Sequence, residues 1–391
     1  MKDRQKKPAQ LRLFAAPPPG LRLGPDLDLD PAARDREIAH ALGAWFDGSA
    51  RDLPWRRDRA PYAVWLSEIM LQQTRVETVI PYFERFLRRY PDVRALAAAE
   101  IDDVLHLWSG LGYYRRARQL HVTAREITER HGGAFPEEAD ALRALPGIGA
   151  YTAGAIASIA YGKRAPLVDG NVARVLARLE DIDDPIKSPA TVKRLWATAD
   201  RLLPADRPGR FNEAMMELGA TVCTPREPRC DACPLERLCL ARAAGREREL
   251  PVVESKRAVP VVELVAVVVA DEKAGTLLFA RRREGGLFGG LWEPPMIEAG
   301  SLDAARAGLT ALGVAFGRTR LGEAGRVTHV LTHRRLEITV VAGPRRAGLT
   351  LREALDAPYE KAAWLDPARP GVGVSTLARK VIAAAKAEQK D

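Results

Sequence analysis

All four cysteines of this 391-residue chain fall within one window of seventeen residues. They are Cys223, Cys230, Cys233 and Cys239, spaced C-x6-C-x2-C-x5-C. Four thiols brought together by a short loop form a metal site far more often than two disulfides in a chain of this size. Zinc ribbons pair two C-x2-C knuckles, but this window holds only one, which suits a larger cubane cluster with one thiolate for each iron. The window therefore predicts a metal site, with an iron–sulfur cluster favoured over zinc.

The length and the charge of the chain limit its class. A chain of this length exceeds a usual single core, so we expect two domains. Sixty Lys and Arg against 51 Asp and Glu give a net charge of +9, which favours a polyanionic partner. The apolar run Leu264–Ala270 is too short to span a bilayer. The basic N-terminus lacks the apolar core of an export signal, so we expect an intracellular protein.

The hydrophobic pattern changes along the chain. Residues 1–31 have no regular period and are predicted to be a disordered tail. Residues 32–244 are helical in pattern, for example at Val172, Val175, Leu176 and Leu179. Residues 245–260 are predicted to be a linker, and residues 261–391 contain alternating segments typical of strands. The predicted strands are Val261–Ala270, Thr276–Ala280 and Leu336–Ala342.

Two short motifs in the helical part suggest a binding turn and a helix cap. Gly147 and Gly149 flank Ile148 just before a helix, so the backbone N–H groups of this turn could bind a phosphate. An ordinary turn between packed helices is the alternative. Asp169 comes at the start of another predicted helix, whose N-terminus favours the ionised carboxylate. A single Asp in this position is usually a helix cap.

Glu68 is the only charged residue between Pro61 and Thr74, and its neighbours are apolar. A carboxyl group among apolar side chains loses hydration, so its pKa rises and it stays protonated near neutral pH. This is the state that a general acid requires. The alternative is a glutamate that faces solvent on an otherwise buried helix.

Taken together, the hairpin turn, Asp169 and the four cysteines resemble the helix-hairpin-helix base-excision DNA glycosylases. The segment Trp65–Thr74 closely resembles the adenine DNA glycosylases of the MutY family, which remove adenine mispaired with 8-oxoguanine. The resemblance implies an all-α helix-hairpin-helix glycosylase domain with a 4Fe-4S cluster loop at residues 223–239, followed by an α+β Nudix-like domain. It also implies a monomer in the cytoplasm, associated with the nucleoid, that binds double-stranded DNA containing A:8-oxoguanine or A:G mispairs.

The same resemblance assigns catalytic roles. Glu68 would protonate adenine, and the anion of Asp169 would stabilise the oxocarbenium-like sugar. Asn171 and Tyr151 would position Asp169 and the sugar. Family members that also cleave the DNA backbone carry a lysine at the place of Tyr151, whose amine forms a Schiff base. The resemblance therefore implies a monofunctional enzyme that uses water.

Further residues are implied in binding. Trp55, Arg56 and Glu213 would line the adenine pocket, although Glu213 could be a surface charge on a helix. An extruded base leaves a gap in the duplex, and the candidates to fill it are Gln72, Gln73 and Tyr113. Within the cysteine loop, Arg226 and Arg229 are candidates to contact DNA phosphates, and solvated side chains are the alternative.

The segment Gly289–Pro295 resembles the approach to a Nudix box. A working box needs a helix with clustered glutamates to hold magnesium, but no Asp or Glu lies between Asp303 and Glu323. The resemblance therefore implies a domain that senses the lesion and does not hydrolyse nucleotides.

The lesion contacts are expected in one short segment of this domain. The candidates are His329, Thr332 and His333, in a segment where the family usually has Phe-Ser-His. Leu331 and Thr332 depart from that pattern. Ordinary strand residues are the alternative.

Two other functions remain open from the sequence. One is a pyrimidine-lesion glycosylase with lyase activity, of the endonuclease III type, which Tyr151 and the additional domain argue against. The other is a non-catalytic iron–sulfur DNA-binding protein, which would require Glu68 and Asp169 to be incidental.

Overall fold

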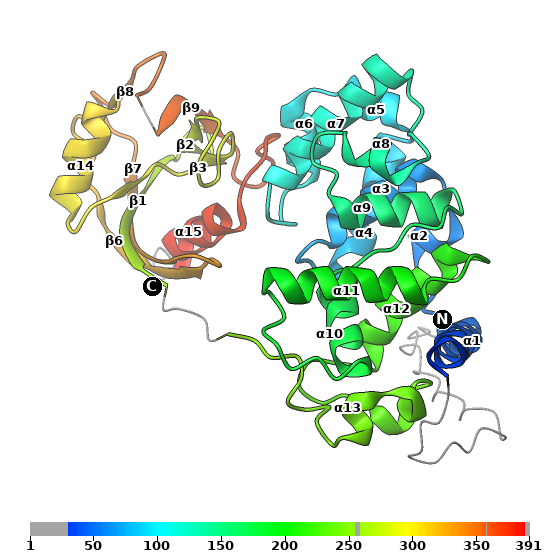
Figure 1. The fold of residues 1–391 in the computed structure, drawn as a ribbon. Helices are drawn as coiled ribbons and strands as arrows, with labels where there is room; N and C mark the ends of the chain where they lie inside the picture. Colours follow the sequence, from blue (N-terminus) through cyan, green and yellow to red (C-terminus); the bar gives the residue numbers. More distant parts are fainter. Residues whose placement is uncertain (1–29, 255–258, 357, 388–391) are drawn as a thin grey trace, which may run out of the picture. The chain divides into compact units, whose positions relative to one another are not determined.

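The computed structural model describes residues 30–254, 259–356 and 358–387 (Figure 1). The predicted tail 1–31 therefore lies almost wholly outside the described residues. The chain divides into two compact units. The first comprises the described residues up to Ile69 and those from Ala134 to 254, and the second comprises Met70–Gly133 and the described residues from 259 onward. The domain boundaries predicted from the sequence stay a prediction. No helix in the described ranges is long and apolar enough to cross a membrane.

The first unit is helical. Its elements are α1 (Pro31–Ser49), α2 (Pro54–Arg57), most of α3 (Pro61–Leu71), α8 (Ala139–Arg143), α9 (Ala150–Ala155), a π-helix (Ile156–Ala160), α10 (Gly170–Leu179), α11 (Pro189–Leu202), α12 (Pro208–Thr221), two 3₁₀ turns (Cys230–Ala232 and Glu236–Leu238) and α13 (Leu240–Ala243). Side chains cap several of these helices: Asp30 caps α1, Asp169 caps α10 and Ser188 caps α11. These caps satisfy backbone N–H groups that a helix start would otherwise leave unpaired.

The core of this unit joins α1, α10, α11 and α12. The helix face predicted from Val172, Val175, Leu176 and Leu179 is buried in it, as expected. Gly219 lets α12 approach α10 closely, because a Cβ at this position would lie 2.7 Å from the Cβ of Asn171. Helix α12 is thereby fixed beside the start of α10, where Asp169 lies.

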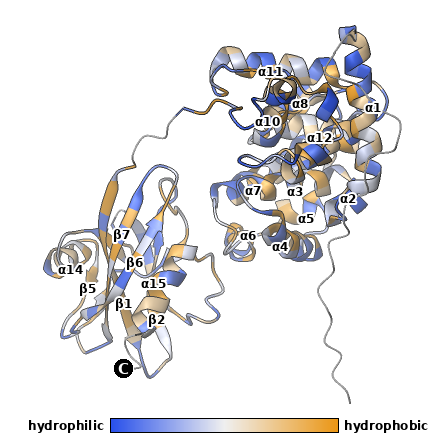
Figure 2. Ribbon diagram, turned by 90° about the horizontal axis from the view of Figure 1, so that it is seen from below, coloured by the Kyte–Doolittle hydropathy of each residue, from blue (hydrophilic) through white to orange (hydrophobic). Residues whose placement is uncertain are grey.

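Helix α3 is hydrophobic along most of its length (Figure 2). Its residues from Tyr62 to Met70 are all buried. The aromatic ring of Trp65 packs edge-on against Phe135, with 5.3 Å between the ring centroids. The polar side chains of Ser67 and Glu68 are therefore enclosed with the apolar ones.

The second unit contains four further helices before its sheet. These are α4 (Val76–Arg89), α5 (Val93–Ala97), α6 (Ile101–Leu107) and α7 (Arg115–His131). The side chain of Asp92 caps α5 by accepting a hydrogen bond of 2.8 Å from Ala95 N. Helix α7 is followed by its C-cap residue Gly132, which adopts the left-handed conformation that favours glycine.

The C-terminal part of this unit contains a mixed sheet, a separate two-stranded sheet in which β5 pairs with β8, and helices. Its elements are β1 (Val261–Asp271), β2 (Thr276–Arg282), β3 (Trp292–Glu293), β4 (Met296–Glu298), α14 (Leu302–Ala311), β5 (Val314–Ala315), β6 (Gly322–Val330), β7 (Arg335–Pro344), β8 (Thr350–Leu351), β9 (Tyr359–Leu365) and α15 (Thr376–Ala387). The main strand order is β3-β2-β1-β7-β6, with β4 paired to β1 and β9 to β2. Strands β1 and β7 are parallel, while the other pairs of this sheet are antiparallel.

Both faces of the sheet are covered, α14 on one side and α15 on the other (Figure 1). Alternate residues of β1 supply the two cores. Val265, Val267 and Val269 pack in the α14 core, whereas Ala266 and Val268 pack in the α15 core. A strand that is buried on both faces has apolar residues at successive positions. This explains the uninterrupted apolar sequence of residues 264–270.

Candidate active site

Glu68 and Tyr151 meet inside the first unit, on α3 and α9. Tyr151 Oη donates a hydrogen bond of 2.5 Å to Glu68 Oε2, and Oη also lies 3.1 Å from Met216 Sδ. Glu68 is only 5% exposed, so the alternative of a solvent-facing side chain is wrong. Burial raises the pKa of Glu68 to about 7, although the hydrogen bond from Tyr151 opposes this rise. The negative charges of Asp169 and Glu213 add to it.

Asp169 caps α10, but burial changes its ionisation. Its Oδ1 accepts a hydrogen bond of 2.7 Å from Val172 N. We expected the helix N-terminus to favour the ionised carboxylate. Burial outweighs that effect and raises the pKa of Asp169 above its ordinary value, even though hydrogen bonds from Val172, Asn171 and the charge of Arg174 act in the opposite direction. Glu68 and Asp169 are therefore two interacting carboxyl groups that both hold their protons more tightly than in water.

A chain of hydrogen bonds leads from Asp169 toward the cysteine loop. Asn171 Nδ2 donates to Asp169 Oδ2 at 3.2 Å, and Asn171 Oδ1 accepts from Arg174 Nη2 at 2.9 Å. Arg174 Nε donates to the backbone oxygen of Cys223 at 2.8 Å. The orientation of Asp169 is thus connected to the position of the first cysteine.

Trp55, Arg56 and Glu213 lie together beside this site. Trp55 is buried on the short helix α2, and Arg56 Nε lies 3.6 Å from Glu213 Oε1. Glu213 is 4% exposed, so the alternative of a surface charge is wrong. Burial raises the pKa of Glu213, while the positive charges of Arg59 and Arg56 reduce the rise. The charges of Glu213 and Arg56 both act on the pKa of Glu68, so these two side chains lie close enough to influence the buried carboxyl group.

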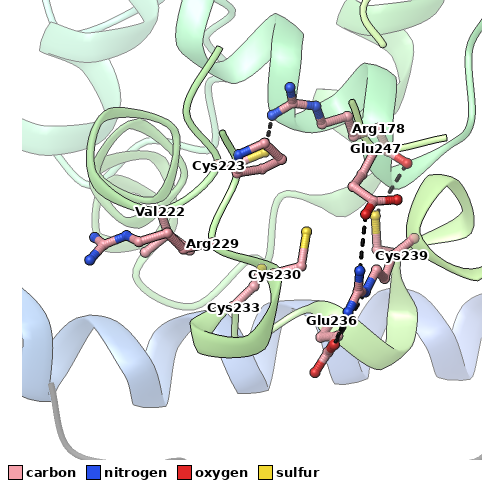
Figure 3. A pocket seen from close by; sticks show the side chains of 11 residues that line it. Arg178, Val222, Cys223, Arg229, Cys230, Cys233, Glu236, Cys239 and Glu247 are labelled. Carbon is pink, nitrogen blue, oxygen red and sulfur yellow. Dashed lines mark hydrogen bonds and ion pairs between the residues drawn. The ribbon is translucent and has the colours of Figure 1, made fainter. Parts of the chain in front are cut away.

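The four cysteines line one pocket next to Arg178 and Arg242 (Figure 3). Burial raises the pKa of the thiols of Cys230, Cys233 and Cys239, that of Cys239 to about 11. Within the described ranges, no three His, Cys, Asp or Glu side chains converge closely enough to hold a single metal ion.

Arg178 stabilises the start of the cysteine loop through several hydrogen bonds. It is almost fully buried on α10, and its guanidinium donates to Cys223 Sγ at 3.2 Å, to Thr224 O at 2.7 Å and to Pro225 O at 3.1 Å. Its Nε donates to Leu250 O at 2.9 Å. One side chain therefore ties the start of the cysteine loop to the segment that follows it.

Some of the donor groups predicted to contact DNA phosphates already make hydrogen bonds within the protein. In the turn before α9, Gly147 has a φ of 76° and Ile148 N donates to Leu145 O at 3.3 Å, so this N–H is not directed outward. Gly149 is the N-cap residue of α9. In the cysteine loop, Arg229 donates to the backbone oxygen of Thr221, while the Arg226 side chain is exposed. Arg226 is the better placed of the two arginines for an external anion.

The predicted wedge residues lie in the second unit, on two turns with unusual backbone conformations. Gln73, which follows α3 together with the exposed Gln72, has a φ of 57°, and Tyr113 has a φ of 49°. A non-glycine residue with positive φ is uncommon and costs free energy, so such turns persist only where other contacts hold them. The Tyr113 side chain is 48% exposed.

Arg116 holds both turns. Its guanidinium donates to Met70 O at 2.7 Å and Gln72 O at 2.6 Å on one turn, and to Gly112 O at 3.2 Å on the other. It also lies over the ring of Tyr113, 5.5 Å from the centroid. The sequence alone did not single out this function for Arg116, because an arginine at the start of a helix resembles a surface charge.

Two of the three predicted lesion contacts, Thr332 and His333, lie at the tip of the hairpin that joins β6 and β7, whereas His329 is a strand residue of β6. Thr332 and His333 are both exposed there, and Leu331 N closes the turn by donating to Arg334 O at 2.9 Å. His329 is half-buried on β6, with its ring 6.3 Å from that of Phe288. Thr332 and His333 are therefore loop residues and not the ordinary strand residues of the alternative.

Comparisons with known proteins agree with this architecture. The model of the HhH-GPD superfamily base excision DNA repair proteins matches residues 66–198, and that of the NUDIX domain matches residues 265–384. The chain is 49% identical to the human adenine DNA glycosylase over 219 residues, which cover 54% of this chain and 40% of the relative. It is 39% identical to the rat adenine DNA glycosylase over 354 residues, which cover 76% of this chain and 69% of the relative. A solved structure of a thermostable thymine-DNA glycosylase matches with a TM-score of 0.50 and 29% identity, covering 54% of this chain and 97% of that one.

The two family models thus confirm the predicted fold class, a helical domain of the HhH-GPD superfamily followed by a NUDIX domain. The chain belongs to the adenine DNA glycosylase family. Its matches span 40% of the human relative and 41% of the mouse relative, less than half the length of either.

Proposed function

We propose that the protein is a monofunctional adenine DNA glycosylase that hydrolyses the N-glycosidic bond of adenine mispaired with 8-oxoguanine, or with guanine, in duplex DNA. The observation that carries this proposal is the buried carboxyl group of Glu68, whose pKa of about 7 lets it donate a proton at neutral pH. It interacts electrostatically with Asp169, the second carboxyl group that the chemistry requires.

In this proposal Glu68 transfers its proton to a ring nitrogen of the extruded adenine, which makes the base a better leaving group. As the C–N bond breaks, positive charge develops on the sugar, and the ionised Asp169 stabilises it. Water then adds to the sugar and gives its proton to the carboxylate of Glu68, which leaves an abasic site and restores the acid. Asn171 orients Asp169 through its hydrogen bond, and Tyr151 holds Glu68 in place.

Tyr151 supports water as the nucleophile. Burial raises its pKa well above the ordinary value, so Oη keeps its proton and serves as a hydrogen-bond donor to Glu68. A phenol has no amine with which to form a Schiff base, so this position offers no route to strand cleavage.

The cysteine site fits a 4Fe-4S cluster. Cys223, Cys230, Cys233 and Cys239, which all line one pocket, would hold it, one thiolate for each iron, and their spacing with a single C-x2-C suits a cubane better than one zinc ion. The raised pKa values of these thiols indicate that buried thiolates need compensating positive charge. When bound, the cluster would fix the shape of the loop that carries Arg226. Hydrolysis of a glycosidic bond transfers no electrons.

The substrate is double-stranded DNA with A:8-oxoguanine or A:G mispairs, which suits the net charge of +9. Gln73 and Tyr113 would enter the base stack when adenine leaves it. Thr332 and His333, exposed on their hairpin, would contact 8-oxoguanine, the hydroxyl group of Thr332 meeting a polar purine edge. The enzyme would act as a monomer on nucleoid DNA in the cytoplasm.

One assay tests this function against its two rivals. A labelled duplex with adenine opposite 8-oxoguanine is incubated with the protein, and strands are separated with and without subsequent alkali. Strand breaks that occur only after alkali support the proposal. Breaks without alkali would identify a lyase, and no breaks under either condition would identify a binding protein. A duplex with adenine opposite thymine is the matched control and should remain intact.

A further inference from the structure

Helix α12 carries two buried glutamates that lie on one face. Glu213 and Glu217 are four residues apart, so their side chains are neighbours along the helix. They are 4% and 1% exposed. Both face arginines from the segment that includes α2, yet their partners differ.

Glu217 is fully engaged by two arginines. Its Oε1 accepts from Arg51 Nε at 2.7 Å, and its Oε2 accepts from Arg51 Nη2 and from Arg56 Nη2, each at 2.8 Å. Arg56 Nη1 in turn donates to Arg51 O at 3.0 Å. Burial alone would raise the pKa of Glu217, but the hydrogen bonds from Arg51 and Arg56 outweigh it and lower the pKa. Glu217 therefore stays ionised and holds both arginines.

Glu213 is held much less firmly. Arg56 Nε lies 3.6 Å from its Oε1, beyond hydrogen-bond length. Arg59 Nη2 lies 2.8 Å from its Oε2, but no group of the described residues makes a hydrogen bond of good geometry to that oxygen. The Arg59 side chain is 47% exposed, so this ion pair is weakened by solvent. Glu213 thus keeps acceptor capacity although its side chain is buried.

We propose that Glu217 is a positioning residue that holds Arg51 and Arg56 and thereby leaves Glu213 available to the extruded base. Arg56 lies between the two carboxylates, and a guanidinium released from Glu217 would pair with Glu213, the other buried anion within reach. An adenine edge presents an amino donor next to a ring-nitrogen acceptor. A carboxylate that is not hydrogen-bonded to the neighbouring fixed arginine complements that pair, whereas a carboxylate already paired with that arginine does not. The inference rests on the function proposed above.

The test separates base capture from DNA binding. Glu217→Gln is compared with the wild type on two duplexes that are not turned over. One contains 2′-fluoro-2′-deoxyadenosine opposite 8-oxoguanine, in which the fluorine disfavours the oxocarbenium-like state. The other contains a tetrahydrofuran abasic-site analogue and has no base to capture. We expect Glu217→Gln to bind the fluorinated duplex about tenfold more weakly and the abasic duplex as tightly as the wild type.

Glu180→Gln is the matched control. Glu180 Oε1 also bridges two arginines, accepting from Arg34 Nη1 at 2.8 Å and from Arg201 Nη2 at 3.1 Å, and the ion pairs of these arginines involve neither Glu213 nor Glu217. This variant should bind both duplexes as the wild type does. If the substitutions acted only by reducing the stability of the fold, both variants would bind both duplexes more weakly than the wild type.

Arg51→Lys provides a second variant, because removal of Glu217 leaves two arginines without their carboxylate and could prevent folding. Lysine keeps the charge but cannot make the paired hydrogen bonds that Arg51 makes. The same selective loss is expected. Wild-type-like binding of the fluorinated duplex by Arg51→Lys, or an equal loss on both duplexes, would overturn the inference. If the wild type itself failed to release adenine, the proposed function would fall instead, so the two failures are distinguishable.

Discussion

The phenol of Tyr151 donates a hydrogen bond of 2.5 Å to the carboxyl group of Glu68, and both groups are buried. This contact works against the effect of burial, since a hydrogen bond to the carboxylate favours its ionised form. The pKa of Glu68 is therefore a balance between a dry environment that raises it and a donor that lowers it. The result, about 7, places proton donation in the physiological range.

Replacing Tyr151 with Phe should shift that balance. The rate of adenine release requires protonated Glu68, so it should fall as the pH rises through about 7, and it should also fall at low pH as Asp169 gains its proton. Without the donor, the pKa of Glu68 rises further, and the alkaline limb of the profile should move up by about one pH unit. Single-turnover rates from pH 5 to 9 measure this shift. An alkaline limb that stays in place would show that Tyr151 does not act on Glu68.

Ionisation of Glu68 should also lower the free energy of unfolding above neutral pH. Its pKa is raised on folding, so the stabilising contribution is present below the unfolded pKa and is lost as the pH rises through about 7. Glu68→Gln removes the ionisation, and this variant should be more stable than the wild type by about 3 kcal/mol at pH 8 and no more stable near pH 4. Urea unfolding at the two pH values checks this. An equal difference at both would contradict it.

Arg116→Gln should release the backbone conformation of both turns that carry the predicted wedge residues. Its guanidinium holds the backbone beside Gln73 and Tyr113, so its loss releases two turns that are costly to maintain. Excision from duplex DNA should slow by at least about tenfold, and adding Tyr113→Ala should cause little further loss. Arg125→Gln, which removes an exposed charge from the same helix, is the control. Additive losses in the double variant would refute a shared action.

Arg178 and Arg226 should have separable effects. Arg178 donates to the Cys223 sulfur and to the loop backbone, so Arg178→Gln should speed the loss of the cluster's visible absorbance in the presence of a chelator. Arg226→Gln should keep the cluster but reduce the slope of log affinity against log salt by about 0.9. Equal cluster loss in the two variants would contradict the role given to Arg178.

The sequence indicated those site residues that can be recognised from their immediate neighbours in the chain. The cysteine spacing, the isolated charge of Glu68 in an apolar helix and the position of Asp169 before α10 each lie within a short stretch. The contacts of Glu217, Arg116 and Arg174 span longer stretches of the chain or join separate elements. In sequence they resemble ordinary surface charges on helices, and only the packing of α10 against α12 and of α7 against its neighbouring turns distinguishes them.

The direction of the pKa shift of Asp169 likewise could not be predicted from the sequence. The helix N-terminus could be predicted from its neighbours and favours ionisation. The depth of burial depends on distant segments such as α12, and it determines the direction of the pKa shift. Likewise, the strands β1 and β7 could be recognised by composition, but their parallel pairing joins Val261 to Arg335 across many residues and is not visible in either segment.

The most direct test of the account is the release of free adenine by the wild type and by Glu68→Gln from a duplex with adenine opposite 8-oxoguanine. Single-turnover release is measured at pH 7, and duplex binding is measured in parallel. We predict release by the wild type, a decrease of about 10²–10⁴-fold in the variant, and equal duplex affinity, because only the proton donor is lost. Wild-type-like release by Glu68→Gln would contradict the central claim that this buried carboxyl group is the general acid.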